Sequence, residues 1–497
     1  MIRLHRRPHV AASFLTCFGL LALPGWAAAL PEAPEFSPCR LEDPSRLASF
    51  AAECATLDVP EDYAKPDGRR IALFIARVPA ISGRKAPDPL FLLAGGPGMA
   101  ATDMYPGVAG AFTRIGRDRD LILVDQRGTG RSNPLHCDSD ADDSLDPDPA
   151  QLLALTRACL QTLGRRAALE QYTTSVAVRD LEQVRMALGY PQINLYGVSY
   201  GTRVAQHYLR RYPARTRSLI LDGVVPPTLA LGPDIALDAE AALQRILARC
   251  AADQRCAQRF GDPERDYRKL RARLEREPID VRYADPVSDA PQDVRFTSRH
   301  LGVVLRLQSY SSATASLVPL ALEQAAEHDN FVMLAALFAM ISQRLTDALA
   351  AGMHHSVVCT EDVPRIDLGS VDRTRLEATY LGASQLDALL AICGLWPRGV
   401  LDPDLHQPLA SDVPVLLLSG SDDPVTPPNY AEAAAAQLSV ARQLVLDGQG
   451  HGQIGVSCMG SVVAAFVRDR KPAELDVSCL QRIRPPPFFL SPAGPAP

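Results

Sequence analysis

The sequence predicts an α/β fold, a mostly parallel sheet with helices on both faces and a long helical insertion. Three observations lead to this class. Short apolar, β-rich runs alternate with helical patterns in the first half, strand signals nearly vanish from about residue 234 to 395, and apolar runs return from residue 413. Strands that alternate with helices favour a parallel sheet, because each helical crossover returns the chain to the same edge.

Each expected element is a short run with its own periodicity. Ser175 to Leu188 predicts a helix, because Val178, Leu181 and Val184 recur on one face. The expected strands are Ile71–Ala76, Pro89–Leu93, Leu121–Val124, Ile193–Tyr196, Leu219–Leu221, Val413–Leu418 and Gln443–Leu446. The insertion predicts helices at Ile235–Phe260, Pro263–Glu277, Ser312–His328 and Phe331–Ala350.

The chain of 497 residues has room for one large domain with a second inserted into it. We expect a signal peptide at 1–29, the two parts of the core at 30–228 and 406–484, and a helical cap at 229–405. The Pro-rich tail, 485–497, is expected to be extended or disordered. No oligomeric state follows from these patterns.

The first 29 residues are typical of an export signal. Three arginines precede the apolar stretch Val10–Leu23, which is too short for a stable membrane anchor, and Ala27–Ala29 supplies small residues for cleavage. We therefore expect a periplasmic or extracellular protein with no membrane span after cleavage.

Charge and cysteine usage narrow the possible partners. The net charge is −6 and no basic patch is visible, so a nucleic-acid partner is not expected.

The ten cysteines after residue 29 predict disulfides in an exported protein, and sequence proximity suggests the pairs 39–54, 137–159, 250–256, 359–393 and 458–479. There is no C-x-x-C or H-E-x-x-H pattern, and His354-His355 is interpreted as a polar loop pair. We therefore expect neither a metal nor a cofactor.

The most informative motif is Gly197-Val198-Ser199-Tyr200-Gly201, between an expected strand and an expected helix. A serine between two glycines at such a hinge is typical of the nucleophile elbow of α/β-hydrolases. Glycines are required because the turn is tight and neighbouring strands pass close by. Ser199 is therefore the candidate nucleophile.

A serine nucleophile needs a base and an acid that orients the base. Asp423 and His451 follow the last two expected strands, in the Ser–Asp–His order found in hydrolases of this fold. They lie 28 residues apart, enough for one helix and one strand, so both return to the sheet edge of Ser199. Asp422 and Asp222 remain alternative acids.

The developing oxyanion needs backbone donors. The N–H of Tyr200, directly after the nucleophile, is one candidate. The glycine-rich segment after the Pro89–Leu93 strand supplies the second, for which we favour Gly96, with Gly95 as the alternative.

Four motifs together resemble the proline iminopeptidase and tripeptidyl aminopeptidase family of secreted α/β-hydrolases. These are Gly95-Gly96-Pro97-Gly98, Asp125-Gln126-Arg127-Gly128-Thr129-Gly130-Arg131-Ser132, Gly197-Val198-Ser199-Tyr200-Gly201-Thr202 and Asp423-Pro424-Val425-Thr426-Pro427. The segment Cys54 to Pro60 and the pair Cys458 and Cys479 are also similar to that family. Proline iminopeptidases usually carry a histidine where this chain has Ala94, so the likeness favours the tripeptidyl branch.

The resemblance implies an exopeptidase that acts on peptides with a free N-terminus, with Ser199, Asp423 and His451 as its triad. In this family, cap carboxylates recognise the substrate ammonium group, and Glu361 and Asp362 beside Cys359 are the candidates in this chain. A carboxylesterase or lipase with the same triad is the first alternative function. A catalytically silent binding protein is the second.

Overall fold

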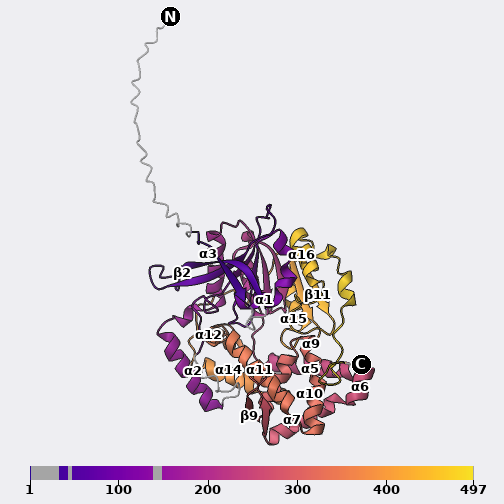
Figure 1. The fold of residues 1–497 in the computed structure, drawn as a ribbon. Helices are drawn as coiled ribbons and strands as arrows, with labels where there is room; N and C mark the ends of the chain where they lie inside the picture. The colour runs from indigo at the N-terminus through magenta and orange to yellow at the C-terminus, as the bar shows by residue number, and fades with distance from the viewer. Residues whose placement is uncertain (2–32, 43–47, 138–147, 496–497) are drawn as a thin grey trace.

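The computed structural model describes residues 1, 33–42, 48–137 and 148–495. The predicted signal peptide therefore lies, except for its first residue, outside the described part of the chain. Figure 1 shows the sheet and its covering helices in the upper part of the molecule. The lower part is mainly helical.

The core is a nine-stranded sheet in the order β1-β2-β3-β5-β4-β6-β7-β10-β11. From β5 to β11 all neighbours in this order are parallel, while β1, β2, β3 and β5 pair antiparallel. The mostly parallel sheet predicted from the sequence is confirmed. The strands are β1 (Ser37–Glu42), β2 (Ser49–Pro60), β3 (Arg70–Val78), β4 (Leu90–Leu93), β5 (Leu121–Val124), β6 (Ile193–Val198), β7 (Thr216–Asp222), β10 (Val415–Gly420) and β11 (Ala441–Leu446).

Alternate residues of the strands divide the buried side chains into two cores. Along β10, for example, Val415 and Leu417 belong to one core and Leu416 and Leu418 to the other. One face is covered by α3 (Thr174–Ala187), α4 (Tyr200–Arg211) and α15 (Pro428–Ala435), and the other by α1 (Ala101–Phe112) and α16 (Met459–Asp469). Helices on both faces leave the carboxyl ends of the parallel strands as the open edge.

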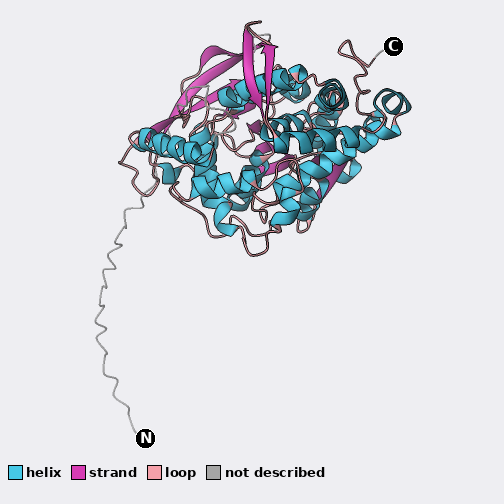
Figure 2. Ribbon diagram, turned by 90° about the horizontal axis from the view of Figure 1, so that it is seen from below, coloured by secondary structure: helices cyan, strands magenta, loops and turns pink. Residues whose placement is uncertain are grey.

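A long, mainly helical segment separates β7 from β10, where the sequence predicts the cap. Helices make up much of the molecule in Figure 2, which is coloured by secondary structure. It also contains a hairpin, β8 (Ile279–Ala284) with β9 (Pro291–Phe296), which was not expected from the sequence. The helices are α5 (Asp234–Ala252), α6 (Gln254–Phe260), α7 (Pro263–Arg276), α8 (Ser298–Gln308), α9 (Ser312–Ala315), α10 (Val318–His328), α11 (Val332–Ala348), α12 (Ala351–Glu361), α13 (Arg373–Glu377) and α14 (Ser384–Cys393). A further helix, α2 (Pro149–Gly164), contacts α12 and α14. The domain boundaries stay predictions.

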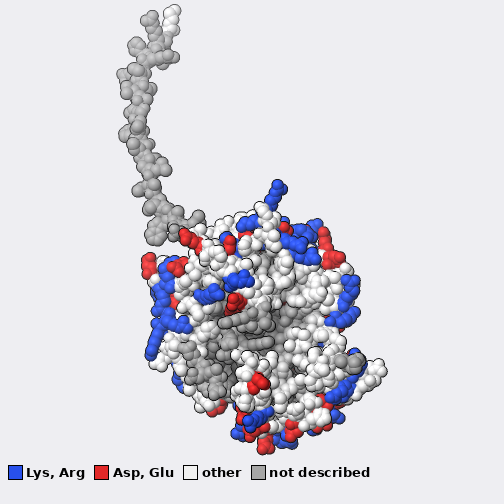
Figure 3. Space-filling view, in the orientation of Figure 1, with Lys and Arg blue, Asp and Glu red and all other residues white. Residues whose placement is uncertain are grey.

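Five disulfides join the pairs that sequence proximity suggests: 39–54, 137–159, 250–256, 359–393 and 458–479. Part of the predicted tail packs against the cap: Phe488 is buried among cap residues and Phe489 N–H donates to the Ser316 carbonyl. Across the described ranges, no helix is long and apolar enough to cross a membrane. Lys and Arg lie interspersed with Asp and Glu around the rim of the face in Figure 3.

Candidate active site

Ser199 lies in the sharp turn between β6 and α4, as the sequence predicts. Its backbone has φ 54° and ψ −124°, a conformation that non-glycine residues rarely adopt and that surrounding structure must maintain. A Cβ on Gly197 would lie 2.3 Å from the Gly201 carbonyl oxygen, and one on Gly201 would lie 2.4 Å from that of Leu93. Both glycines are thus required by close backbone approach.

Asp423 and His451 meet beyond the ends of β10 and β11. His451 Nδ1 lies 2.8 Å from Asp423 Oδ2, and the Asp423 side chain is fully buried. The N–H groups of Val425 and Thr426 donate to Asp423 Oδ1 at 2.8 and 2.9 Å. The aspartate is therefore fixed by backbone donors on one oxygen and faces the histidine with the other.

The pKa values of this pair shift in opposite directions. Burial raises the pKa of Asp423, but the charge and hydrogen bond of His451 and the backbone donors outweigh it and hold that pKa below its usual value. Burial likewise disfavours charged His451, yet the Asp423 carboxylate outweighs it and raises the histidine pKa. The pair thus favours a histidine that readily takes up a proton.

The two alternative acids have other partners. Asp222 is buried at the end of β7, where its carboxylate accepts hydrogen bonds from Gln453 N–H and Ile454 N–H at 2.7 and 2.9 Å. Asp422 lies 3.5 and 3.6 Å from the guanidinium groups of Arg245 and Arg249. Of the three candidates, Asp423 is the one hydrogen-bonded to His451.

Two further residues fit around His451, and neither was predicted from the sequence. A Cβ on Gly223 would lie 2.8 Å from His451 Cε1, and Gly223 has φ +63°. The cap contributes Tyr310, whose carbonyl accepts a hydrogen bond from His451 N–H at 2.7 Å and whose ring meets the imidazole edge-on at a centroid distance of 5.2 Å. Both contacts join distant segments, so local sequence patterns give no signal for them.

The glycine-rich segment after β4 lies beside the candidate nucleophile. A Cβ on Gly95 would lie 3.1 Å from Ser199 Cβ and 3.7 Å from Ser199 Oγ. Gly96 has φ +109°, and its Cβ would lie 2.7 Å from Gly98 N, which describes a tight turn. Both glycines remain candidates for the donor, and the preference for Gly96 stays a prediction.

The Asp125–Ser132 motif mainly ties the core together. Buried Arg127 forms an ion pair with Asp180 of α3 at 2.6 Å, and the Asp125 carboxylate accepts from Thr102 N–H at 3.0 Å. Gln126 is the exception, because its Nε2 donates to the Tyr200 hydroxyl at 3.0 Å. One residue of this motif therefore contacts the residue after Ser199.

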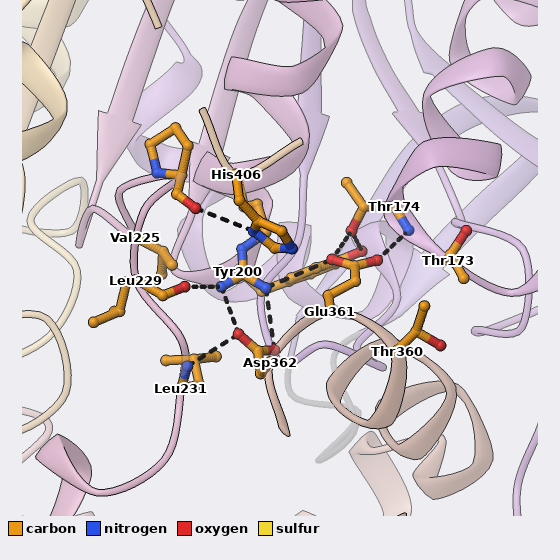
Figure 4. Close-up of polar contacts among 12 residues, drawn as sticks. Thr173, Thr174, Tyr200, Val225, Leu229, Leu231, Thr360, Glu361, Asp362 and His406 are labelled. Atoms are coloured by element: carbon orange, nitrogen blue, oxygen red, sulfur yellow. Dashed lines mark hydrogen bonds and ion pairs between the residues drawn. The ribbon is translucent and has the colours of Figure 1, made fainter. Parts of the chain in front are cut away.

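Glu361 and Asp362 end a helix rather than lying in a loop, and His354-His355 belongs to the same helix, α12. Both carboxylates are fully buried and have protein partners (Figure 4). Glu361 accepts from Thr174 N–H and Oγ1 at 2.7 and 2.8 Å, and Asp362 accepts from both terminal nitrogens of Arg203 at 2.8 and 3.1 Å. Burial raises the pKa of Glu361 to about 7, although the Arg203 charge opposes the shift. Their role in binding a substrate ammonium group stays a prediction.

Across the described residues, no group of three or more His, Cys, Asp and Glu is placed to hold a metal ion. The polar groups at the sheet edge are instead a serine, a histidine and an aspartate, together with backbone amides. These residue types are the ones that the sequence predicts for a nucleophile, a base and an acid, and their roles stay predictions.

Residues 88–455 match the alpha/beta hydrolase fold family, and the chain belongs to that family. It is similar over most of its length to serine protease Hip1 of Mycobacterium tuberculosis, with 28% identity covering 92% of this chain and 94% of that protein. Carboxylesterase B of the same species is 29% identical over 93% of this chain and 96% of its own. Tripeptidyl aminopeptidase of Streptomyces lividans is 30% identical over a shorter region, 35% of this chain and 36% of that protein. The resemblance inferred from the motifs is confirmed by these relatives.

Proposed function

We propose that the protein is an exported serine exopeptidase, similar to tripeptidyl and prolyl aminopeptidases, that cleaves peptide bonds near a free N-terminus. The observation that carries the proposal is the Asp423–His451 hydrogen bond at the sheet edge of the Ser199 elbow. The similarity to serine protease Hip1 and to a tripeptidyl aminopeptidase supports a peptide substrate.

In the proposed reaction, His451 removes the proton from Ser199 as Oγ attacks the scissile carbonyl carbon. Because Nδ1 is bound to Asp423, Nε2 is the nitrogen that exchanges protons with substrate and serine. The N–H groups of Gly96 and Tyr200 stabilise the oxyanion, and protonated His451 then gives its proton to the leaving amine. Water, activated by the same histidine, hydrolyses the acyl-enzyme and regenerates Ser199.

Recognition of the substrate ammonium group by Glu361 or Asp362 belongs to the same proposal. It would require one of these carboxylates to exchange a protein donor, Thr174 or Arg203, for the substrate. Export to the periplasm or the medium is supported by the five disulfides, because such bonds persist in oxidising compartments.

A carboxylesterase is the second candidate, since the same residues hydrolyse esters and a carboxylesterase is similar to almost the whole chain. A catalytically silent binding protein is disfavoured by the Asp423–His451 hydrogen bond beside the elbow.

The test compares peptidyl anilides with a free N-terminus, their N-acetylated forms and p-nitrophenyl esters, for wild type and Ser199→Ala. We expect release from the free anilides, loss of release on acetylation, and fluorophosphonate labelling that Ser199→Ala abolishes. Strong ester turnover without release from any peptide would select the esterase. Equal labelling of wild type and Ser199→Ala would overturn the enzymatic function.

A further inference from the structure

The cap helix α12 contacts the core at both candidate sources of oxyanion donors. At its first end, Ala350 N–H donates to the Gly98 carbonyl at 3.0 Å, and His354 Nδ1 lies 3.2 Å from the Pro97 carbonyl oxygen. Pro97 and Gly98 are the next two residues after Gly96. At its other end, Glu361 accepts both hydrogen bonds from Thr174. One helix therefore touches the glycine-rich segment and the neighbourhood of Tyr200.

The contact with Tyr200 runs through the Thr174 hydroxyl. Thr174 Oγ1 donates its only proton to Glu361 Oε2 at 2.8 Å, as Figure 4 shows. While Glu361 is ionised, the Tyr200 hydroxyl, 2.7 Å from Thr174 Oγ1, is the donor in that pair, and Gln126 Nε2 donates to the Tyr200 hydroxyl. The hydrogen bonds therefore form a chain: Gln126 donates to Tyr200, Tyr200 to Thr174 and Thr174 to the Glu361 carboxylate, which is the final acceptor.

Asp362 contacts the same helix as Tyr200, one turn further along. Its two oxygens accept from Arg203, and Oδ1 also accepts from Leu231 N–H at 3.0 Å. Glu361 Oε2 lies 3.5 Å from Arg203 as well. Glu361 is thus hydrogen-bonded to Thr174 of α3, and both Glu361 and Asp362 lie close to Arg203 of α4. Tyr200, Arg203 and both acids are almost fully buried.

We propose that α12 positions the oxyanion site, with Glu361 acting through Thr174 as a positioning residue for Tyr200. This inference rests on the proposed function, because it concerns the donor N–H of Tyr200. Oxyanion donors work only when they are fixed before the reaction, and displacements below 1 Å already reduce the rate. A buried, fully satisfied chain of hydrogen bonds supplies that rigidity by fixing the far end of the Tyr200 side chain.

The test is a set of variants that remove single links of the chain: Tyr200→Phe, Thr174→Val and Glu361→Gln. Each keeps the volume of the side chain, and Tyr200→Phe keeps the backbone N–H. Thr173→Val is the matched control, because Thr173 carries a buried hydroxyl beside Thr174 that donates to the Val400 carbonyl instead, at 2.7 Å. Activity is measured on whichever anilide or ester wild type hydrolyses.

We expect each of the three variants to lower kcat about tenfold to a hundredfold, with KM within about twofold of wild type, because the lost interaction acts in the transition state. The double variant of Thr174→Val with Tyr200→Phe should be no slower than the worse single variant, since both break one chain. Thr174→Ser should restore kcat, and Thr173→Val should change stability but not kcat.

Three results would overturn the inference while leaving the proposed function intact. The first is an unchanged kcat in all three variants, and the second is a rise of KM alone in Glu361→Gln. The third is a loss of kcat in Thr173→Val as large as in the three variants. The second result would instead identify Glu361 as a group that binds substrate. A wild type that hydrolyses neither anilides nor esters and is not labelled at Ser199 would overturn the proposed function, and the inference with it.

Discussion

The sheet edge and the contact between core and cap each bury an aspartate against a cation-forming side chain, but the two pairs differ in kind. Asp423 faces His451, a side chain that can gain and lose a proton, whereas Asp362 faces Arg203, which stays charged. Both aspartates are fully buried. The first pair has the proton-transfer chemistry that the proposed reaction needs, while the second pair joins α12 to α4 through a permanent charge. Burial alone does not mark a catalytic carboxylate; its partner does.

The largest expected effect comes from breaking the first pair. Asp423→Asn should lower kcat about 10⁴-fold, because the amide no longer holds His451 in the correct tautomer or stabilises its charge. Steady-state kinetics on the best anilide measure this effect. Asp422→Asn, at the adjacent residue that faces arginines, should leave kcat close to wild type. A similar loss in both variants would contradict the assignment.

Breaking the second pair should have its main effect on stability. Asp362→Ala leaves the buried Arg203 charge with only the more distant Glu361, so the free energy of unfolding should fall by about 3–5 kcal/mol. Chemical denaturation measures this quantity. Asp387→Ala, from the exposed pair with Arg373, is the control and should have a much smaller effect. If the two variants were equally stable, the Asp362–Arg203 pair would not be what holds α12 against α4.

Gly223→Ala tests the packing around the Asp423–His451 pair. The added methyl group would lie 2.8 Å from His451 Cε1, so the imidazole must shift and kcat should fall about tenfold to a hundredfold. Gly189→Ala is the matched control, because Gly189 also has a positive φ, +72°, but has open space around its Cβ position. Both variants should be somewhat less stable than wild type, but only Gly223→Ala should have a lower kcat. An equal kcat in the two variants would show that the close contact between Gly223 and His451 does not affect the rate.

The smallest expected effect is a pH dependence of stability from Glu361. The folded protein binds this proton more tightly than the unfolded chain, because the pKa rises from 4.5 to about 7. The contribution of Glu361 to stability is therefore present at low pH and is lost as pH rises between these values. Glu361→Gln should remove that loss, so its unfolding free energy should improve relative to wild type from pH 5 to pH 8. Exposed Glu264→Gln should show no such trend.

The sequence was most predictive where chemistry depends on local order along the chain. The elbow around Ser199, the residues after β10 and β11 and the five cysteine pairs could all be placed from short spacings. The sequence favoured Asp423 but left Asp222 and Asp422 as alternatives, because all three lie at or just after the end of a strand. The structure adds that Asp423 is the one hydrogen-bonded to His451.

The predictions fell short where contacts join distant segments or where strands are exposed. The partners of Glu361 and Asp362 lie more than 130 residues away, so no local pattern reveals them. The β8–β9 hairpin has few buried side chains, and its alternation of apolar residues is correspondingly weak. β1 is similarly exposed along most of its length, which explains why it was not expected.

The contact between Tyr310 and His451 has a consequence for how caps can diverge or be exchanged between relatives. The backbone N–H of His451 donates a hydrogen bond to the main-chain carbonyl oxygen of Tyr310 in the cap, and every residue type has such an oxygen. Substitutions in the cap can therefore alter the shape above the reaction centre without removing this hydrogen bond. A chimera that keeps the backbone path of residues 309–310 should retain the histidine in place, whereas a deletion there should misplace it even if every triad residue is intact.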